Sequence, residues 1–89
     1  MRLRYAALAQ SDLIEIAEYI AQDSPAADEL TIIKFPGKFP LVGNRLGRQL
    51  RRRPWRYFAI YYVVGEQDVE VVRILHSARD HERILFPED

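Results

Sequence analysis

The chain has 89 residues, of which 48% are hydrophobic and 29% charged; this is typical of one small globular domain and excludes a second core. The net charge is zero, but residues 1–30 hold six acids against two bases, whereas residues 31–56 hold eight bases and no acid. Such an asymmetry fits either a surface for an anionic partner or an acidic helix beside a basic loop.

The first third of the chain predicts a short strand at residues 2–8 and then two helices. Apolar residues recur on one helical stripe, which predicts a helix from about Ala7 to Gln22 with its acids on the other side. The stripe consists of Ala9, Leu13, Ile16, Ala17 and Ile20, and the polar side of Asp12, Glu15, Glu18 and Gln22. Ser24 can cap a second helix that starts at Pro25, and Pro36 and Gly37 end it.

The remainder of the chain predicts a loop and then strands. Residues 35–47 contain two prolines and three glycines and predict a loop. Residues 48–54 predict a short strand broken by Pro54, and residues 56–64 and 69–75 predict a hairpin around a turn at 65–68. Both hairpin strands are apolar at nearly every position, so both faces of the sheet should be covered. The helices can cover one face, and either a partner or the C-terminal segment (76–89) can cover the other. That segment is polar and can form a short helix, and its apolar anchor consists of Ile84, Leu85 and Phe86. The order β-α-α-β-β-β predicts an α+β domain with a largely antiparallel sheet.

The sequence RRRPWRYFAIYY (51–62) places four arginines within six residues, next to an aromatic strand. On a strand, Arg51 and Arg53 point one way and Arg52 the other. Arginine binds phosphates and carboxylates, but it cannot act as a general base. The cluster therefore predicts either an anion-binding surface or a charged strand that resists edge-to-edge pairing. Trp55 and Tyr57 suit stacking on bases or a place in the core.

The remaining chemistry is sparse, and no cofactor is expected. His76 and His81, five residues apart in a chain without cysteine, do not form a metal site. The absence of cysteine also excludes disulfides and fits the cytoplasm. No stretch matches a glycine-rich phosphate loop or the length of a membrane span. His76, at the end of a predicted strand, suits either an acid/base role or a structural hydrogen bond.

Three stretches carry a family resemblance: SDLIEIAEYIAQDSPAADEL (Ser11–Leu30), FPLVGNRLGRQLRRRPWRYFAIYYVV (Phe39–Val64) and VEVVRILHSARD (Val69–Asp80). In this order they resemble the RelE/ParE superfamily of bacterial, plasmid-stabilising type II toxins, and its ParE branch in particular. The resemblance implies a helical hairpin packed on a small sheet over residues 1–89, and neutralisation by a cognate antitoxin, ParD-like with a ribbon-helix-helix fold. The chain departs from the family pattern in its second helix, for which only Ala26 to Lys34 fit.

The resemblance also implies one of two targets, because ParE-type toxins bind DNA gyrase and RelE-type toxins cut messenger RNA on the ribosome. RNA cleavage requires a base, an acid and cations. Acids are absent between residues 30 and 65, and no lysine follows residue 39. This favours a gyrase-binding toxin without catalytic residues. The alternatives are a ribonuclease that uses Arg51, Arg53 and Arg56 for phosphate charge and His76 as acid/base, or an inactive antitoxin-binding relative.

Two binding sets follow from these expectations. The target-binding residues are Arg73, His76, Arg79 and Asp80, near the C-terminal strand. The antitoxin-binding residues are Arg51, Arg52, Arg53, Trp55, Arg56 and Tyr57, whose charge suits an acidic antitoxin tail. We expect no contact with membranes and no sequence-specific binding of nucleic acid.

Overall fold

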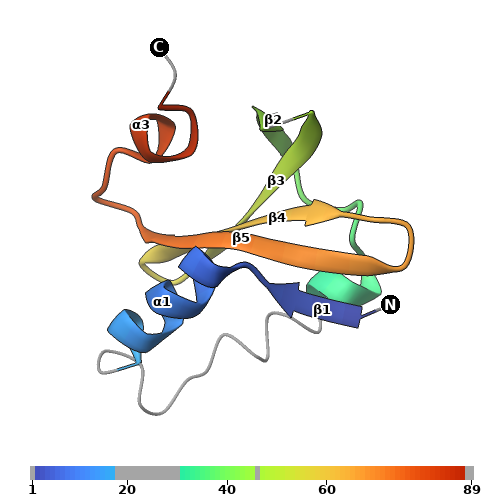
Figure 1. Ribbon diagram of the computed structural model, residues 1–89, viewed down its shortest axis with the longest axis horizontal. Coiled ribbons are helices and arrows are strands. Elements are labelled where there is room, and N and C mark those ends of the chain that lie inside the picture. Colours follow the sequence, from blue (N-terminus) through green and yellow to red (C-terminus); the bar gives the residue numbers. More distant parts are fainter. Residues whose placement is uncertain (1, 18–30, 46, 88–89) are drawn as a thin grey trace.

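The computed structural model describes residues 2–17, 31–45 and 47–87 (Figure 1). Its elements are β1 (Arg2–Tyr5), α1 (Ala7–Ile16), β2 (Leu41–Arg45), β3 (Arg48–Trp55), β4 (Phe58–Val64), β5 (Asp68–His76) and α3 (His81–Leu85), and residues 31–34 are also helical. The strands form one sheet in the order β1-β5-β4-β3-β2. Strand β1 runs parallel to β5 and the other pairs are antiparallel, which confirms the predicted α+β class with a mostly antiparallel sheet.

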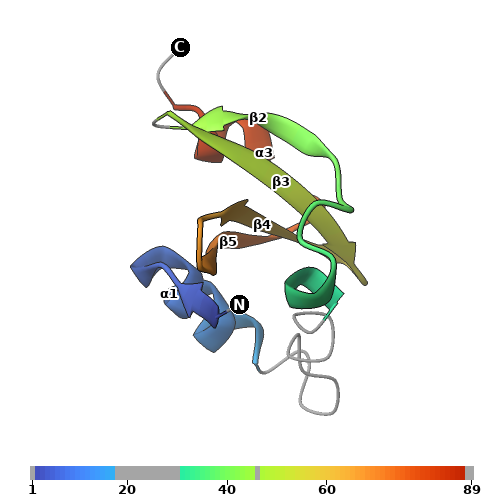
Figure 2. The same ribbon diagram turned by 90° about the vertical axis from the view of Figure 1, so that its right-hand side faces the viewer.

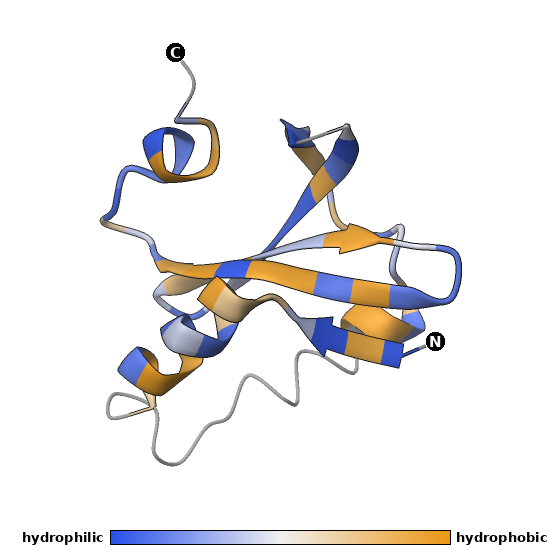
Figure 3. Ribbon diagram, in the orientation of Figure 1, coloured by the Kyte–Doolittle hydropathy of each residue, from blue (hydrophilic) through white to orange (hydrophobic). Residues whose placement is uncertain are grey.

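Both faces of the sheet are covered, as the apolar strands predict. Figure 2 shows α1 and residues 31–34 on one side of the sheet and α3 on the other. The first core lies under α1 and centres on Tyr62 and Ile60, and the second lies under α3 and centres on Tyr61 and Leu75. Leu85 of α3 is 2% exposed. Helix α3 thus covers the second face. Figure 3 shows hydrophobic stretches on β4 and β5, those of β5 being separated by hydrophilic positions.

One residue of α1 was assigned to the wrong side of the helix. Asp12 was predicted on the polar side but is 4% exposed, whereas Ala17 was predicted in the apolar stripe and is exposed. Position 12 lies three residues after Ala9 and four before Ile16, so helical geometry places it on the buried face. The predicted extension of this helix to Gln22, and the start of a second helix at Pro25, lie outside the described residues.

The carboxylate of Asp12 takes the place of a missing strand. Strand β1 ends at Tyr5, opposite Val71, so among the described residues the outer edge of β5 has no strand partner beyond that point. Asp12 Oδ2 accepts the backbone N–H of Ile74 at 2.9 Å and the Nε–H of Arg73 at 2.8 Å, and its Oδ1 accepts Nη2–H of Arg73 at 2.9 Å. A buried carboxylate is tolerable here because it is paired and hydrogen-bonded.

The predicted loop at 35–47 is wrong in its second half, which contains β2. Gly43 and Pro40 led to the loop prediction, but β2 pairs with β3 through its backbone. Pro54 also does not break β3; it lies inside it, opposite Ala59. Its nitrogen faces the β2 side, as does Arg52 N, which donates to Pro40 O at 3.1 Å. Strand β2 does not extend along β3 as far as Pro54. The missing N–H of Pro54 therefore leaves no carbonyl of β2 without a donor.

The strand predicted to run from Arg56 to Val64 begins at Phe58 instead. Trp55 pairs directly with Phe58, so Arg56 and Tyr57 form a two-residue turn between β3 and β4. Arg56 has a φ of 53°, the left-handed conformation that such turns require and that glycine adopts most readily. The sequence did not reveal this turn because Arg56 and Tyr57 are not among the residues typical of such turns, which are glycine, asparagine and aspartate.

Candidate protein-interaction site

Two arginines of the cluster attach the segment before β2 to the sheet. Arg51 and Arg53 lie on the same face of β3, opposite Tyr62 and Ile60 of β4, as their spacing predicts. Arg51 Nη1 donates to Phe39 O at 2.6 Å and to Gly37 O at 3.3 Å. The guanidinium of Arg53 lies 4.8 Å from the centre of the Phe39 ring, and its Nη1 donates to Pro54 O at 2.8 Å. These side chains therefore serve the fold before any partner is present.

The aromatic neighbours of this attachment are also structural. Tyr62 lies opposite Arg51 on β4, is fully buried, and its hydroxyl donates to Pro36 O at 3.0 Å. Burial raises the pKa of Tyr62 above its ordinary value of 10.0, and the charges of Arg51 and Arg53 oppose this rise. Trp55 is 6% exposed and packs on Phe58, with ring centres 5.9 Å apart. Trp55 thus belongs to the core, where the sequence left a choice between core and stacking.

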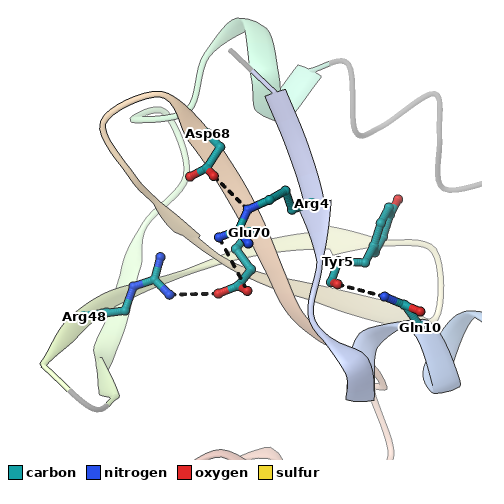
Figure 4. A network of polar contacts seen from close by, with 6 residues as sticks. All are labelled: Arg4, Tyr5, Gln10, Arg48, Asp68 and Glu70. Atoms are coloured by element: carbon teal, nitrogen blue, oxygen red, sulfur yellow. Dashed lines mark hydrogen bonds and ion pairs between the residues drawn. The ribbon is translucent and has the colours of Figure 1, made fainter.

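Other bases of the 31–56 segment are engaged within the chain as well. Figure 4 shows Glu70 between Arg4 and Arg48, at 3.8 Å and 2.8 Å, while Arg4 also reaches Asp68 at 2.7 Å. This network connects β1, β5 and β3 across the sheet. One base of the 31–56 segment, Arg48, is thus paired with Glu70 of β5, which reduces the charge that this segment presents to a partner.

The C-terminal helix is held by one histidine and one arginine. His81 Nε2 lies 2.7 Å from His76 O, which can only accept, so that nitrogen carries the proton and His81 Nδ1 accepts from Tyr61 Oη at 2.6 Å. Arg45 Nε donates to Leu85 O at 3.0 Å. His81, which the sequence leaves with His76 and the tyrosines as a possible base, therefore fastens α3 to β4 and β5.

The predicted target-binding residues divide into two pairs. Arg73 is bound to Asp12, and this hydrogen bond, opposed by desolvation, raises the pKa of its guanidinium. Asp80 accepts the backbone N–H of Arg83 at 3.2 Å and caps α3. His76 and Arg79 are exposed, as is Asp80; His76 is the last residue of β5, and Arg79 lies in the turn that follows it. The ring of His76 packs edge-on against Phe58, and its Nδ1 accepts from Ala78 N at 3.0 Å.

The turn after β5 lies beside the turn between β3 and β4. Ser77 N donates to Tyr57 O at 2.8 Å, so the two turns are joined by their backbones at the same end of the sheet (Figure 1). We call five exposed residues at these two turns the turn surface: Arg56, Tyr57, His76, Ser77 and Arg79; Ala78 and Asp80 beside them are exposed as well. It combines two residues from the predicted antitoxin set with two from the predicted target set. Sequence patterns could not reveal this, because about twenty residues separate the turns.

Two of the three arginines of the ribonuclease alternative, Arg51 and Arg53, lie away from His76, whereas the third, Arg56, shares the turn surface with it. His76 shares the row Trp55–Phe58–His76 across three strands, and Arg53 lies in the next row on that face. Strand geometry separates their backbones by roughly 12 Å. The side chains of Arg51 and Arg53 are turned to residues 37–39 and 54 rather than to His76. Cations, but no adjacent base, therefore line this part of β3.

A model of the family described as "ParE toxin of type II toxin-antitoxin system, parDE" matches residues 3–81. The chain belongs to the ParE toxin family. The match spans β1 to the first residue of α3, so it includes Asp12, the arginines of β3 and the turn surface. Membership makes the chain a toxin of a type II toxin–antitoxin system, which implies a cognate antitoxin as partner.

A comparison with curated proteins finds no significant match. In the described part of this ParE-family chain, no helix has the length and apolar character needed to cross a membrane. The functional interpretation therefore depends on the family and on the geometry of the chain's own residues.

Proposed function

We propose that this toxin inhibits DNA gyrase by binding to it, without catalysis, and that a ParD-like ribbon-helix-helix antitoxin neutralises it. The observation that carries this proposal is the engagement of Arg51 and Arg53 with backbone carbonyls and the Phe39 ring. Two of the three arginines that the ribonuclease alternative would use to stabilise phosphate charge are thus engaged in holding the fold together.

The chemistry of RNA cleavage supports the same choice. A general base must lie within hydrogen-bond reach of the 2′-hydroxyl that it deprotonates, close to cations that stabilise the phosphorane. His76 has one ring nitrogen engaged by Ala78 N and lies at the end of the sheet, away from the side chains of Arg51 and Arg53. Inhibition by binding requires an exposed surface that complements the target, and the residues of the turn surface are exposed.

The proposed antitoxin contact uses Arg52 on the other face of β3. Arg52 pairs with Tyr61 across the strands and is partly exposed, whereas its neighbours Arg51 and Arg53 lie on the opposite face. An acidic antitoxin segment would pair with this charge. Arg52→Glu should weaken co-purification with the antitoxin encoded beside the toxin. Arg2→Glu, on the exposed start of β1, is a matched control that should leave co-purification intact.

The proposal is tested by following two cellular processes after induction of the toxin without its antitoxin. We expect DNA-damage signalling and filamentation before translation declines, and the purified toxin should block supercoiling by purified gyrase. Co-expression of the neighbouring antitoxin should restore growth. Early loss of translation with cleaved transcripts would contradict the proposal and support the ribonuclease alternative, and harmless expression would support the inactive relative.

A further inference from the structure

The turn surface presents an aromatic side chain that folding does not use. Tyr57 is 73% exposed, whereas Trp55 and Phe58 on either side of the turn are 6% and 8% exposed. Tyrosine is enriched in the energetically dominant positions of protein interfaces because it offers a large rigid area with a polar tip. The tip of a hairpin turn is a position that a partner can reach without moving the sheet.

The backbone of the same turn holds an arginine where glycine would fit better. Arg56 is the one residue other than glycine with a positive φ in the described ranges 2–17, 31–45 and 47–87. A side chain in this conformation is strained, and such strain is concentrated at functional sites. Arginine at this position therefore weakens the turn but places a cation next to Tyr57.

The second turn adds to the charge and rigidity of this surface. The bond from Ser77 N to Tyr57 O and the packing of His76 on Phe58 fix the two turns against each other. Arg79 N donates to His76 O at 3.0 Å, which closes the second turn and places the exposed Arg79 within it. The surface thus combines one exposed tyrosine, two arginines and a histidine, and it adjoins the exposed Asp80, whose carboxylate accepts Arg83 N at the start of α3.

We infer that the turn surface is where the toxin contacts its target, and that it recognises an acidic segment of a protein, with Tyr57 as the anchor between Arg56 and Arg79. This assignment rests on the proposed gyrase-binding function, and it moves Arg56 and Tyr57 from the predicted antitoxin set to the target set. Arginine forks pair with carboxylates, and the tyrosine buries apolar area between them. A single-stranded nucleic acid is less suited, because such ligands are held by several aromatics along a basic groove.

The test uses three variants of the full chain: Tyr57→Ala, Arg56→Gly and Arg79→Ala. Their matched controls lie outside the turn surface. Phe35→Ala removes an aromatic side chain that is 50% exposed, and Arg2→Ala removes an exposed arginine of the edge strand β1. Each protein is measured for growth arrest, for inhibition of purified gyrase, for thermal unfolding, and for binding to a single-stranded DNA oligonucleotide. We expect Tyr57→Ala to weaken growth arrest and gyrase inhibition by about tenfold or more, with the controls unchanged. Arg56→Gly should lose activity while it unfolds at the wild-type temperature or higher, by up to about 4 °C, because glycine relieves the strain.

The outcomes separate the surface from the identity of the target. If all three variants arrest growth as strongly as wild type while they remain folded, the turn surface is not the contact, even where gyrase is inhibited. If the variants no longer arrest growth but the wild type does not inhibit gyrase, the turn surface is still the target contact, and the proposed inhibition of gyrase is wrong. If the wild type binds the oligonucleotide and Tyr57→Ala does not, the inference that the turn surface recognises an acidic protein segment is overturned, and nucleic acid is its ligand instead. A wild type that arrests no growth would overturn both.

Discussion

The body of the sheet and the turn surface use the same residue type for different purposes. In the body, Arg73, Arg51 and Arg48 are each paired with a carboxylate or a backbone carbonyl of another segment. On the turn surface, Arg56 occupies a strained position and Arg79 is exposed in a turn. Arginines that connect distant segments stabilise the fold, whereas those at the turns lie on an exposed surface of the molecule. Arginine density alone therefore does not locate a binding site, since the partners of each guanidinium decide its role.

The largest expected effect comes from breaking the ion pair of Asp12 with Arg73. Arg73→Ala leaves a carboxylate that is 4% exposed without its cation, which should lower the free energy of unfolding by about 3–5 kcal/mol. Urea denaturation measures this loss. The raised pKa of Arg73 lies far above neutrality, so its contribution persists through all moderately alkaline conditions and would be lost only as the pH rises through that pKa. Equal stability of wild type and variant would place Arg73 among the residues of the binding surface instead.

A smaller loss is expected from Arg51→Ala, which removes the donor to Phe39 O and Gly37 O. Hydrogen bonds from charged donors contribute about 1.5–3 kcal/mol each when well formed. Because this side chain is partly exposed, we expect the free energy of unfolding to fall by about 1.5 kcal/mol. Hydrogen exchange should show faster opening of residues 37–41. Arg79→Ala is the control, with unchanged exchange in this segment. A stable variant that no longer binds antitoxin would return Arg51 to the predicted antitoxin set.

Tyr62→Phe tests the buried side of the arginine cluster through its pH dependence. Loss of the hydrogen bond to Pro36 O should cost about 1 kcal/mol at neutral pH. Because the pKa of Tyr62 is raised in the folded state, the unfolded chain releases this proton first as the pH rises above 10.0. The stabilisation from Tyr62 is therefore present below pH 10.0 and is lost as the pH rises through the folded pKa. The free energies of unfolding of the two proteins should converge at alkaline pH, and a constant difference would contradict this.

The smallest effect on stability is expected for Arg79→Ala, within about 0.5 kcal/mol of wild type, as for an exposed residue away from structural contacts. Thermal unfolding measures it, and growth arrest in the same variant should fall. A stability loss comparable to that of Arg51→Ala would remove the distinction between the body and the turn surface.

The sequence predicted the parts of this fold that depend on local pattern. Strands β4 and β5 followed from their β-branched and aromatic residues, and the covered second face followed from the absence of polar alternation. The opposite orientations of Arg51 and Arg52 followed from strand geometry alone. Ile84, Leu85 and Phe86 were identified as an anchor, and all three pack against the second core.

The features that sequence did not predict depend on long-range pairing. Asp12 was misplaced because its buried position is acceptable only with Arg73, which lies 61 residues away. Strand β2 was missed because its backbone pairing tolerates Gly43, over which the Phe86 ring lies so closely that a Cβ would meet it at 2.7 Å. The turn surface was divided between two predicted sets because only the folded sheet joins Tyr57 to Ser77.

The central claim is tested most directly by equilibrium binding of the purified toxin to purified DNA gyrase, without ribosomes or DNA. Direct binding is predicted, and it should weaken as salt screens the turn-surface arginines and fall by about tenfold in Tyr57→Ala. Absence of binding by the folded wild type, together with cleavage of messenger RNA on added ribosomes, would contradict the account.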